Sequence, residues 1–192
     1  MKLDKSITND LAAYMNTRAD IPDGWLYLGD SKERYVLGQP GQYNLMVVGV
    51  NPSTAVPNKD DQTIRKVRQV VATADYDGWI MVNLYPQITK DPDQLDVAAD
   101  SRLTAGNIQV IQALFKQYMI GGVWAAWGDL IDKRYYLGKQ LVKIEAISTD
   151  CEWYYKGTLT KKGNPRHPLY MKTDEQFECF PVWDYACAWM EL

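Results

Sequence analysis

From residue 43 onward, short apolar runs rich in β-branched residues alternate with segments whose apolar residues recur at helical spacing. The runs show no polar alternation, which is typical of strands that are covered on both faces. The expected strands cover residues 43–50, 79–85, 123–127 and 151–155. The expected helices cover residues 60–74, 103–119 and 131–147. Strands that alternate with helices predict an α/β fold with a mainly parallel sheet.

This regular region divides the chain into three segments. Residues 1–42 are punctuated by Gly and Pro and read as irregular, with one short helical candidate at residues 9–18, and we expect an N-terminal extension packed on the body. Residues 43–172 form the expected α/β domain. Residues 173–192 are too aromatic to be loose, so we expect this tail to pack on the same domain as a helix or cover.

Composition excludes several classes of protein. No apolar run approaches the ~18 residues of a membrane span, and the first six residues lack the apolar stretch of a secretory signal. The three cysteines, Cys151, Cys179 and Cys187, form no paired spacing, and His167 is the only histidine. The chain therefore cannot build a Cys/His zinc site or a four-cysteine iron–sulfur site by itself. We expect no membrane contact, no metal, no cofactor and a reducing, cytoplasmic location.

The charge of the chain is unevenly distributed. Residues 133–172 contain nine Lys or Arg and three acidic residues, so this segment carries +6 and leaves −9 for the rest of a chain of net charge −3. A basic segment around the only histidine is suited to phosphate, whereas the acidic remainder argues against wrapping a long duplex. The alternative is a solvated surface whose charges have no binding role.

Four polar or Gly- and Pro-rich segments follow the expected strands, at residues 49–54, 83–86, 127–129 and 163–170. In open parallel sheets, ligands bind beyond the carboxyl ends of the strands. The polar side chains of these segments would be costly to bury without partners, so each segment has a turn role or a ligand role. Phosphate-loop and dinucleotide fingerprints are absent, which disfavours kinases and dehydrogenases.

Each polar candidate has a structural alternative. Asn51 before Pro52 is typical of a turn, and Ser53 is typical of a helix cap. Asn83 offers a donor and an acceptor at the end of an apolar strand, or it bonds neighbouring loop backbone. His167 is the best candidate for a titrating or oxyanion-stabilising group, unless it is a packed surface residue.

The aromatic and charged candidates are more ambiguous. Tyr85, Trp127 and Tyr170 are placed to stack on a base, although in a chain with seven Trp and thirteen Tyr such residues are more often core. Asp61 and Arg65 lie at the start of the first expected helix, where they either contact a substrate or cap and brace the helix. We expect a cleft floored by strand ends with one of these aromatic residues as a wall.

Five motifs occur in order along most of the chain. They are GVNPSTA at 49–55, DDxTIR at 60–65, VNL at 82–84, AWG at 126–128 and TKxGxPRHPLY at 160–170. This set resembles an uncharacterised bacterial and phage family, catalogued as domain of unknown function 1643, over about residues 33–172. The family name implies no activity.

The same order of elements is similar, more distantly, to the uracil-DNA glycosylase superfamily. Its members carry a Gly-x-Asn-Pro or Gly-x-x-Pro loop after the first strand, an Asn at the end of the second, and a His-Pro or Asn-Pro loop after the fourth. The resemblance implies a three-layer α/β/α sandwich with a four-stranded parallel sheet in the order 2-1-3-4. It also implies that Asn51 positions or activates water, Asn83 reads a pyrimidine edge and His167 stabilises charge on the departing base.

The functional hypotheses follow from this resemblance. The first is an enzyme that hydrolyses an N-glycosidic bond in nucleic acid or a free nucleotide, and the second is a non-catalytic module that binds a nucleotide or modified base. The third is an interaction protein whose partner covers the aromatic tail. We expect substrate contacts from Pro52, Ser53, Thr54, Asp61, Arg65, Asn83, Tyr85, Trp127, Gly128, Arg166 and Tyr170. The base and the oligomeric state are not indicated.

Two departures from the glycosylase pattern bear on these hypotheses. The motif continues His167-Pro168-Leu169-Tyr170, where glycosylases favour a Ser-rich loop that pinches the DNA backbone. The first loop carries Asn51 where the most active branch has Asp. In the catalytic hypothesis, His167 donates a hydrogen bond to the leaving group, while Arg166 and neighbouring lysines hold phosphate.

Overall fold

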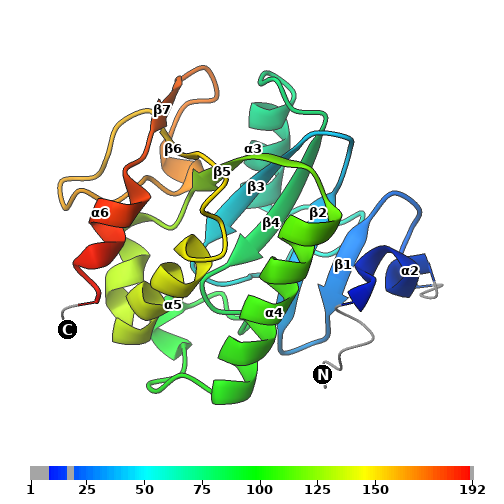
Figure 1. Ribbon diagram of the computed structural model, residues 1–192, viewed down its shortest axis with the longest axis horizontal. Helices are drawn as coiled ribbons and strands as arrows, with labels where there is room; N and C mark the ends of the chain where they lie inside the picture. Colours follow the sequence, from blue (N-terminus) through cyan, green and yellow to red (C-terminus); the bar gives the residue numbers. More distant parts are fainter. Residues whose placement is uncertain (1–8, 17–19, 191–192) are drawn as a thin grey trace.

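The computed structural model describes residues 9–16 and 20–190, which are organised around one seven-stranded sheet (Figure 1). The strand order is β1-β2-β4-β3-β5-β6-β7. The strands are β1 Leu26–Gly29, β2 Arg34–Gln39, β3 Asn44–Gly49, β4 Gly78–Asn83, β5 Ile120–Ala125, β6 Trp153–Lys156 and β7 Phe177–Cys179. The central strands β4, β3, β5 and β6 are parallel to one another. The outer strands β1, β2 and β7 pair antiparallel.

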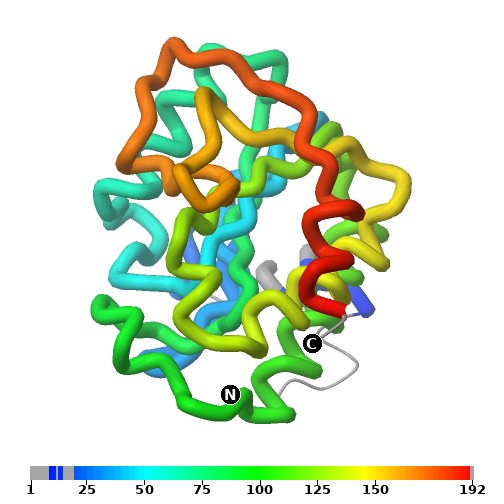
Figure 2. Tube along the Cα trace, turned by 90° about the vertical axis from the view of Figure 1, so that its left-hand side faces the viewer, coloured from blue at the N-terminus to red at the C-terminus, as the bar shows by residue number. Residues whose placement is uncertain are grey.

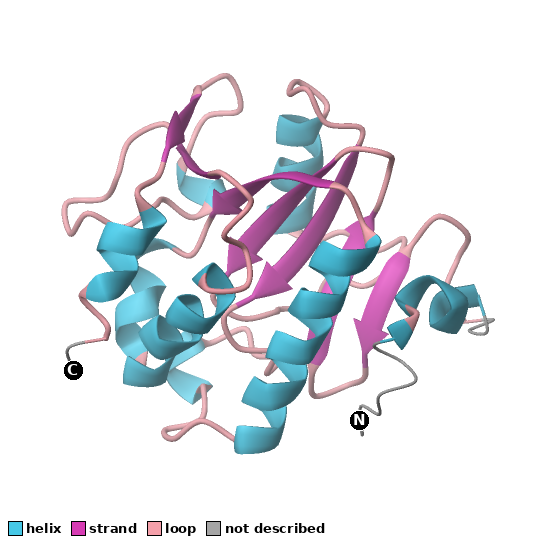
Figure 3. Ribbon diagram, viewed as in Figure 1, coloured by secondary structure: helices cyan, strands magenta, loops and turns pink. Residues whose placement is uncertain are grey.

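Helices cover both faces of this sheet (Figure 3). The helix α3 Gln62–Val71 packs on one face, and α4 Ser101–Gln117 and α5 Tyr135–Glu145 pack on the other. The shorter helices are α2 Leu11–Asn16 and α6 Val182–Cys187, and the 3-10 turns are η1 Pro92–Gln94, η2 Gly128–Lys133 and η3 Pro168–Tyr170. None of the described helices is long and apolar enough to cross a membrane.

The two central strands are buried along their whole length. Leu45 and Val47 of β3 pack with Ile64 of α3, whereas Met46 and Val48 belong to the core cluster under α4 and α5. Because both faces of the sheet are covered, alternate strand residues all face apolar neighbours, and no polar alternation is left in the sequence. The prediction of a mixed α/β fold is confirmed.

The expectation of a four-stranded sheet is wrong, because three antiparallel strands extend the sheet at its two edges. The four expected strands are β3, β4, β5 and β6, and within the larger sheet they lie in the order β4-β3-β5-β6. β5 begins at Ile120, earlier than expected. Gly121 and Gly122, which lie between the expected helix over residues 103–119 and the expected strand over residues 123–127, are part of this strand.

The first 42 residues contain a β-hairpin where the sequence reads as irregular. β1 pairs with β2, and β2 pairs with β4, so this hairpin covers the edge of the parallel strands. Each hairpin strand contains a glycine and the loops around them contain more, which obscured the two short apolar runs. Of the helix expected over residues 9–18, α2 Leu11–Asn16 is present, and residues 17 and 18 lie outside the described residues.

The helix expected over residues 131–147 is split in two. Arg134 is extended, with φ −141° and ψ 128°, and it separates η2 from α5. Its guanidinium donates hydrogen bonds to the carbonyl oxygens of Asp93 at 2.7 Å and Leu95 at 2.9 Å, which hold the chain in this break. Periodicity alone does not reveal such a break, since apolar spacing continues across it.

The C-terminal residues lie against the same sheet and helices. β7 pairs antiparallel with β6, and α6 packs on α5. Figure 2 shows α6, in red, running beside the yellow-green segment that contains α5. Phe180, between β7 and α6, is buried in the core cluster of α4 and α5. Tyr185 and Trp189 are partly buried against the same cluster, whereas Trp183 is 56% exposed.

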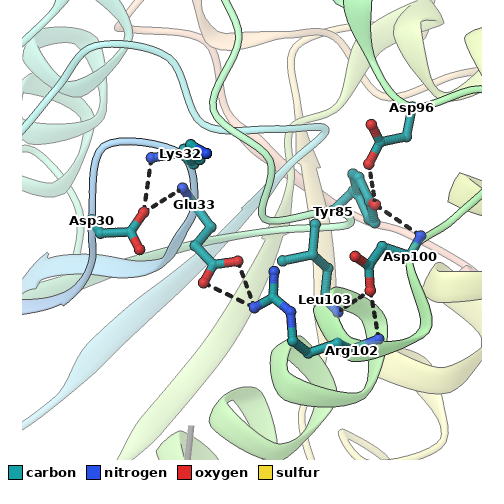
Figure 4. A network of polar contacts seen from close by, with 8 residues as sticks. All are labelled: Asp30, Lys32, Glu33, Tyr85, Asp96, Asp100, Arg102 and Leu103. Atoms are coloured by element: carbon teal, nitrogen blue, oxygen red, sulfur yellow. Dashed lines mark hydrogen bonds and ion pairs between the residues drawn. The ribbon is translucent and has the colours of Figure 1, made fainter. Parts of the chain in front are cut away.

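A network of hydrogen bonds and an ion pair connects the β1–β2 hairpin to α4 (Figure 4). The carboxylate of Glu33, which is 2% exposed, accepts hydrogen bonds from Nη1 of Arg102 at 3.0 and 2.9 Å. Asp30 accepts from the backbone N–H groups of Lys32 and Glu33 at 2.8 and 3.0 Å. Asp100 caps α4 by accepting from the N–H of Arg102 at 2.7 Å. The network holds the start of β2 against the first turn of α4.

We expect the ion pair between Glu33 and Arg102 to stabilise the fold measurably. A double-mutant cycle of Glu33→Gln and Arg102→Met should give a coupling free energy of about 1–3 kcal/mol, because the carboxylate is desolvated. The exposed pair of Lys162 and Asp132, at 2.8 Å, is the control and should give less than about 1 kcal/mol. Chemical denaturation measures both cycles, and equal coupling energies would contradict a special role for the pair whose carboxylate is buried.

Candidate functional site

A cavity of about 420 Å³ opens at the carboxyl ends of β3 and β4. Its walls come from the loop after β3, the first turn of α3, the end of β4 and the loop that enters η3. Of the residues expected in the site, the cavity is lined by Asn51, Ser53, Asp61, Asn83, His167 and Tyr170. Segments that are more than a hundred residues apart in the chain thus meet at one edge of the sheet, as the parallel topology requires.

Asn83 is the last residue of β4 and lies on the wall of the cavity. Its side chain is buried, and among the described residues neither Oδ1 nor Nδ2 has a hydrogen-bond partner. Asn83 is in register with Gly49 of β3, where a Cβ atom would lie only 2.9 Å from Oδ1. The glycine therefore makes room for the amide. A buried amide without partners is costly in a protein alone, so this geometry favours a ligand.

The amide of Asn51 is oriented by two backbone carbonyls. Its Nδ2 donates to the oxygen of Pro52 at 3.0 Å and to the oxygen of Thr89 at 2.9 Å. Because both partners only accept, the nitrogen must face them, and Oδ1 is left as an acceptor at the cavity. In this fixed orientation, Oδ1 of Asn51 can accept a hydrogen bond from a water molecule.

His167 immediately precedes η3, and one of its ring nitrogens accepts a hydrogen bond. Its Nδ1 accepts from the backbone N–H of Leu169 at 3.4 Å, so a neutral ring carries its proton on Nε2. Burial lowers the pKa of His167 to about 4, against the opposing attraction of Asp61. The imidazole is therefore neutral at pH 7 and offers one N–H donor.

The loop that carries His167 is held by Gly128. This glycine has φ +62°, a left-handed conformation that a side chain disfavours. Its N–H donates to the oxygen of Pro165 at 2.8 Å, and a Cβ at this position would lie 3.3 Å from Cβ of His167. Gly128 was expected to touch substrate, and its role in the described structure is to position the histidine loop.

Sequence reasoning missed Arg34 as a residue of the site. It begins β2, is 3% exposed and lines the cavity. Its Nη1 donates to the oxygen of Ala55 at 2.8 Å, whereas its Nε has no partner among the described residues. Burial lowers the pKa of Arg34 to about 10, which leaves the guanidinium charged at pH 7. The pairing of β2 with β4 brings Arg34 to the cavity, and the sequence analysis did not predict the hairpin that contains β2.

Several expected contacts lie outside the cavity. The hydroxyl of Tyr85 donates to Asp96 at 2.7 Å and accepts from the N–H of Asp100 at 3.0 Å, so this buried ring is not a stacking wall. Trp127 is 0% exposed and packs edge-on against Phe180 in the core. Tyr170, which is 74% exposed, is the aromatic side chain from the expected set that lines the cavity.

The remaining expected contacts have structural roles or lie at the surface. Pro52 is buried and contributes the carbonyl that orients Asn51, while Thr54 is exposed. Arg65 is exposed and donates to the oxygen of Asp60 at 3.3 Å, away from the cavity. Asp61 lines the cavity but also caps α3 by accepting from the N–H of Ile64 at 2.9 Å. Its capping role, expected as an alternative, is therefore present.

A second, basic groove of about 690 Å³ adjoins the cavity. His167 and Tyr170 line both spaces, so they stand between them. Trp127, Gly128 and Asp129 also line the groove, and its basic side chains are Lys133, Lys161, Lys162 and Arg166. Lys133 and Lys162 form ion pairs with Asp93 and Asp132. Nε of Arg166 donates to the oxygen of Thr158 at 2.9 Å. The groove therefore presents a net positive charge next to the buried site, with Lys161 and Arg166 outside these ion pairs.

A larger cavity, about 810 Å³, lies at the opposite ends of the parallel strands and is lined by Tyr43, Tyr76 and Tyr154 together with acidic residues. None of the unpartnered buried polar atoms of the described residues belongs to it. Size alone does not make a site, so the smaller cavity is the better candidate. The described residues contain no group of three or more His, Cys, Asp or Glu side chains placed to hold a metal ion.

Comparison with known proteins gives one match. The model of a family described as "Protein of unknown function (DUF1643)" matches residues 34–169, which is more than half of the chain. No curated protein and no solved structure matches the chain. The matched segment begins at Arg34 and includes Asn51, Asn83 and His167.

We expect the pKa of His167, the only histidine, to show that the site is buried. In an NMR titration, the ring of His167 should show a pKa of about 4, because burial disfavours its charged form. Since the unfolded chain binds this proton near pH 6.5, the free energy of unfolding should fall as the pH decreases from about 6.5 to 4. His167→Asn should lack this part of the decrease. Titration near pH 6.5 in the folded protein would show that the ring is hydrated.

Proposed function

This chain belongs to the DUF1643 family of proteins of unknown function, and we propose that it binds a pyrimidine base and hydrolyses the base's N-glycosidic bond. The observation that carries this proposal is the meeting of three groups in one cavity. They are the unpartnered amide of Asn83, the oriented amide of Asn51 and the neutral imidazole of His167. This hydrolysis needs one group that recognises the base, one that positions a water molecule and one that donates a hydrogen bond to the leaving group.

In this proposal, Asn83 recognises the base. A side-chain amide forms two parallel hydrogen bonds with a base edge that has a donor beside an acceptor. The imide edge of uracil or a 5-substituted uracil has this pattern, and pairing would satisfy both Oδ1 and Nδ2 of Asn83. In a duplex, the nucleotide would first have to leave the base stack.

Asn51 and His167 perform the chemistry on the bound base. Oδ1 of Asn51 holds a water molecule that adds its oxygen to the sugar C1′ as the bond from C1′ to the base nitrogen breaks. The electron pair of that bond stays on the base, and Nε2–H of His167 donates a hydrogen bond to the resulting negative oxygen. The proton that the water releases leaves to solvent, and the base anion is protonated after departure.

Two further features support this assignment. The order β4-β3-β5-β6 agrees with the 2-1-3-4 order implied by the resemblance to uracil-DNA glycosylases. The basic groove beside the cavity suits the phosphates of a nucleotide or of nucleic acid. Arg166, which lies in this groove, is the best placed arginine for such a contact, since only its Nε is engaged by Thr158.

A binding module without catalysis is the second candidate, and the identity of residue 51 favours it. An amide orients water but does not accept its proton as a carboxylate does. Asp61, a carboxylate on the cavity wall, is engaged as the cap of α3. This candidate predicts base or nucleotide binding with no release of free base.

The proposed roles separate in paired binding and single-turnover assays on oligonucleotides and nucleotides that contain uracil or 5-substituted uracils. His167→Ala should leave binding nearly intact and slow base release by about 10²–10³-fold. Arg166→Ala should weaken binding and lower its salt dependence by about one counterion. Arg68→Ala, an exposed arginine outside the cavity and the groove, is the control and should change neither quantity.

The outcomes of this assay are distinct. Binding without release of any base across the panel would replace the enzyme with the binding module. A wild-type protein that neither binds nor cleaves any member would overturn both candidates. Equal loss of binding in the His167 and Arg166 variants would contradict the division of roles between cavity and groove.

A further inference from the structure

Arg34 is a buried cation at the wall of the cavity with an incomplete set of partners. Its side chain is 3% exposed, and its one hydrogen bond from Nη1 goes to the backbone oxygen of Ala55. Nε has no partner, and no carboxylate among the described residues lies within ion-pair distance of the guanidinium. Buried charges in proteins are normally paired, so an unpaired one beside a cavity calls for an anionic partner.

The charges around the cavity meet this demand only in part. Asp61 attracts Arg34 from beyond ion-pair distance, but it also caps a helix. Arg34 and Lys90 contribute two positive charges to the cavity walls, against one negative charge from Asp61. His167 adds no charge, because its ring is neutral. The cavity walls thus have a net charge of about +1, which favours a ligand with a negative group.

The position of Arg34 identifies the part of the ligand that it faces. β2 lies beyond β4 in the sheet, whereas the basic groove is built by the loops after β5 and β6, on the other side of β3 (Figure 1). A nucleotide whose phosphates occupy this groove has its sugar near His167 and its base toward Asn83. Arg34 then meets the end of the base that is remote from the sugar and phosphate.

We propose that the ligand is a pyrimidine with an anionic oxygen substituent on the base itself, such as a carboxylate, and that Arg34 selects it. This rests on the proposed binding of a base and adds the substrate class. The planar guanidinium can donate to a carboxylate through two N–H groups, Nε among them. Such a substituent would give the unpartnered Nε an acceptor and neutralise the surplus charge of the cavity.

The test compares matched ligands by calorimetric titration at pH 7.5. The ligands are uracil, uracil-5-carboxylate and uracil-5-carboxamide. The 6-substituted pair is a control, because C6 is next to the nitrogen that bears the sugar and lies away from Arg34 in the proposed orientation. The carboxamide has nearly the size of the carboxylate but no charge. Wild-type protein should bind uracil-5-carboxylate about 10- to 100-fold more tightly than uracil-5-carboxamide, the range for a hydrogen bond to a charged group, and should show no such preference within the 6-substituted pair.

Variants assign this preference to Arg34. Arg34→Gln should reduce the ratio of carboxylate to carboxamide affinity to about one, and Arg34→Lys should retain only part of it. A merely destabilised protein would lose affinity for both ligands alike, so the ratio separates selection from folding. Arg68→Gln is the matched control and should keep the wild-type ratio, since Arg68 lies outside the cavity. The preference should also persist at high salt, because the group is buried.

The results separate this inference from the function on which it rests. Binding of uracil with equal affinities for carboxylate and carboxamide would overturn the role of Arg34 and leave base binding intact. A preference that depends on a 5′-phosphate, seen with uridine 5′-monophosphate over uridine and lost in Arg34→Gln, would also overturn it. No binding of any of these pyrimidines would overturn the proposed function and this inference together.

Discussion

The register between two parallel strands controls the whole arrangement. β3 and β4 pair so that Gly49 lies beside Asn83 at the carboxyl edge, with both strands buried on both faces. This register ends the two strands at the same level, so Asn83 at the end of β4 and the loop after β3 that carries Asn51 reach one cavity. Helices on the two faces fix the register, since a slip of one residue would exchange the side chains of the two core clusters.

The unsatisfied groups at that edge link the fold to function. Natural interiors pair nearly all buried polar atoms. Of the nine buried side-chain polar atoms without partners among the described residues, three belong to Asn83 and Arg34 and lie beside the same cavity. Asn51 and His167, which also line the cavity, are instead fixed by backbone groups, and each keeps one polar side-chain atom without a hydrogen-bond partner among the described residues. Two groups with open hydrogen-bonding capacity and two oriented groups together describe a binding site better than cavity size does.

The sequence predicts those features of the fold and the site that depend on residues close together in the chain, and it misses those that depend on distant segments. The central strands and the meeting of Asn51, Asn83 and His167 follow from apolar runs and parallel topology. The hairpin that brings Arg34 into the site pairs with β4 across more than forty residues, and no local pattern encodes that pairing. The buried hydroxyl of Tyr85 forms hydrogen bonds with the side chain of Asp96 and the backbone N–H of Asp100. The composition of the chain does not reveal these contacts.

A crystal structure with a bound pyrimidine base tests the central claim most directly. The account predicts the base in the 420 Å³ cavity, with its imide edge within about 2.7–3.2 Å of both Oδ1 and Nδ2 of Asn83. It also predicts a water molecule on Oδ1 of Asn51. A base bound instead in the tyrosine-lined cavity at the opposite ends of the parallel strands, or one that leaves both Asn83 atoms unpartnered, would contradict it.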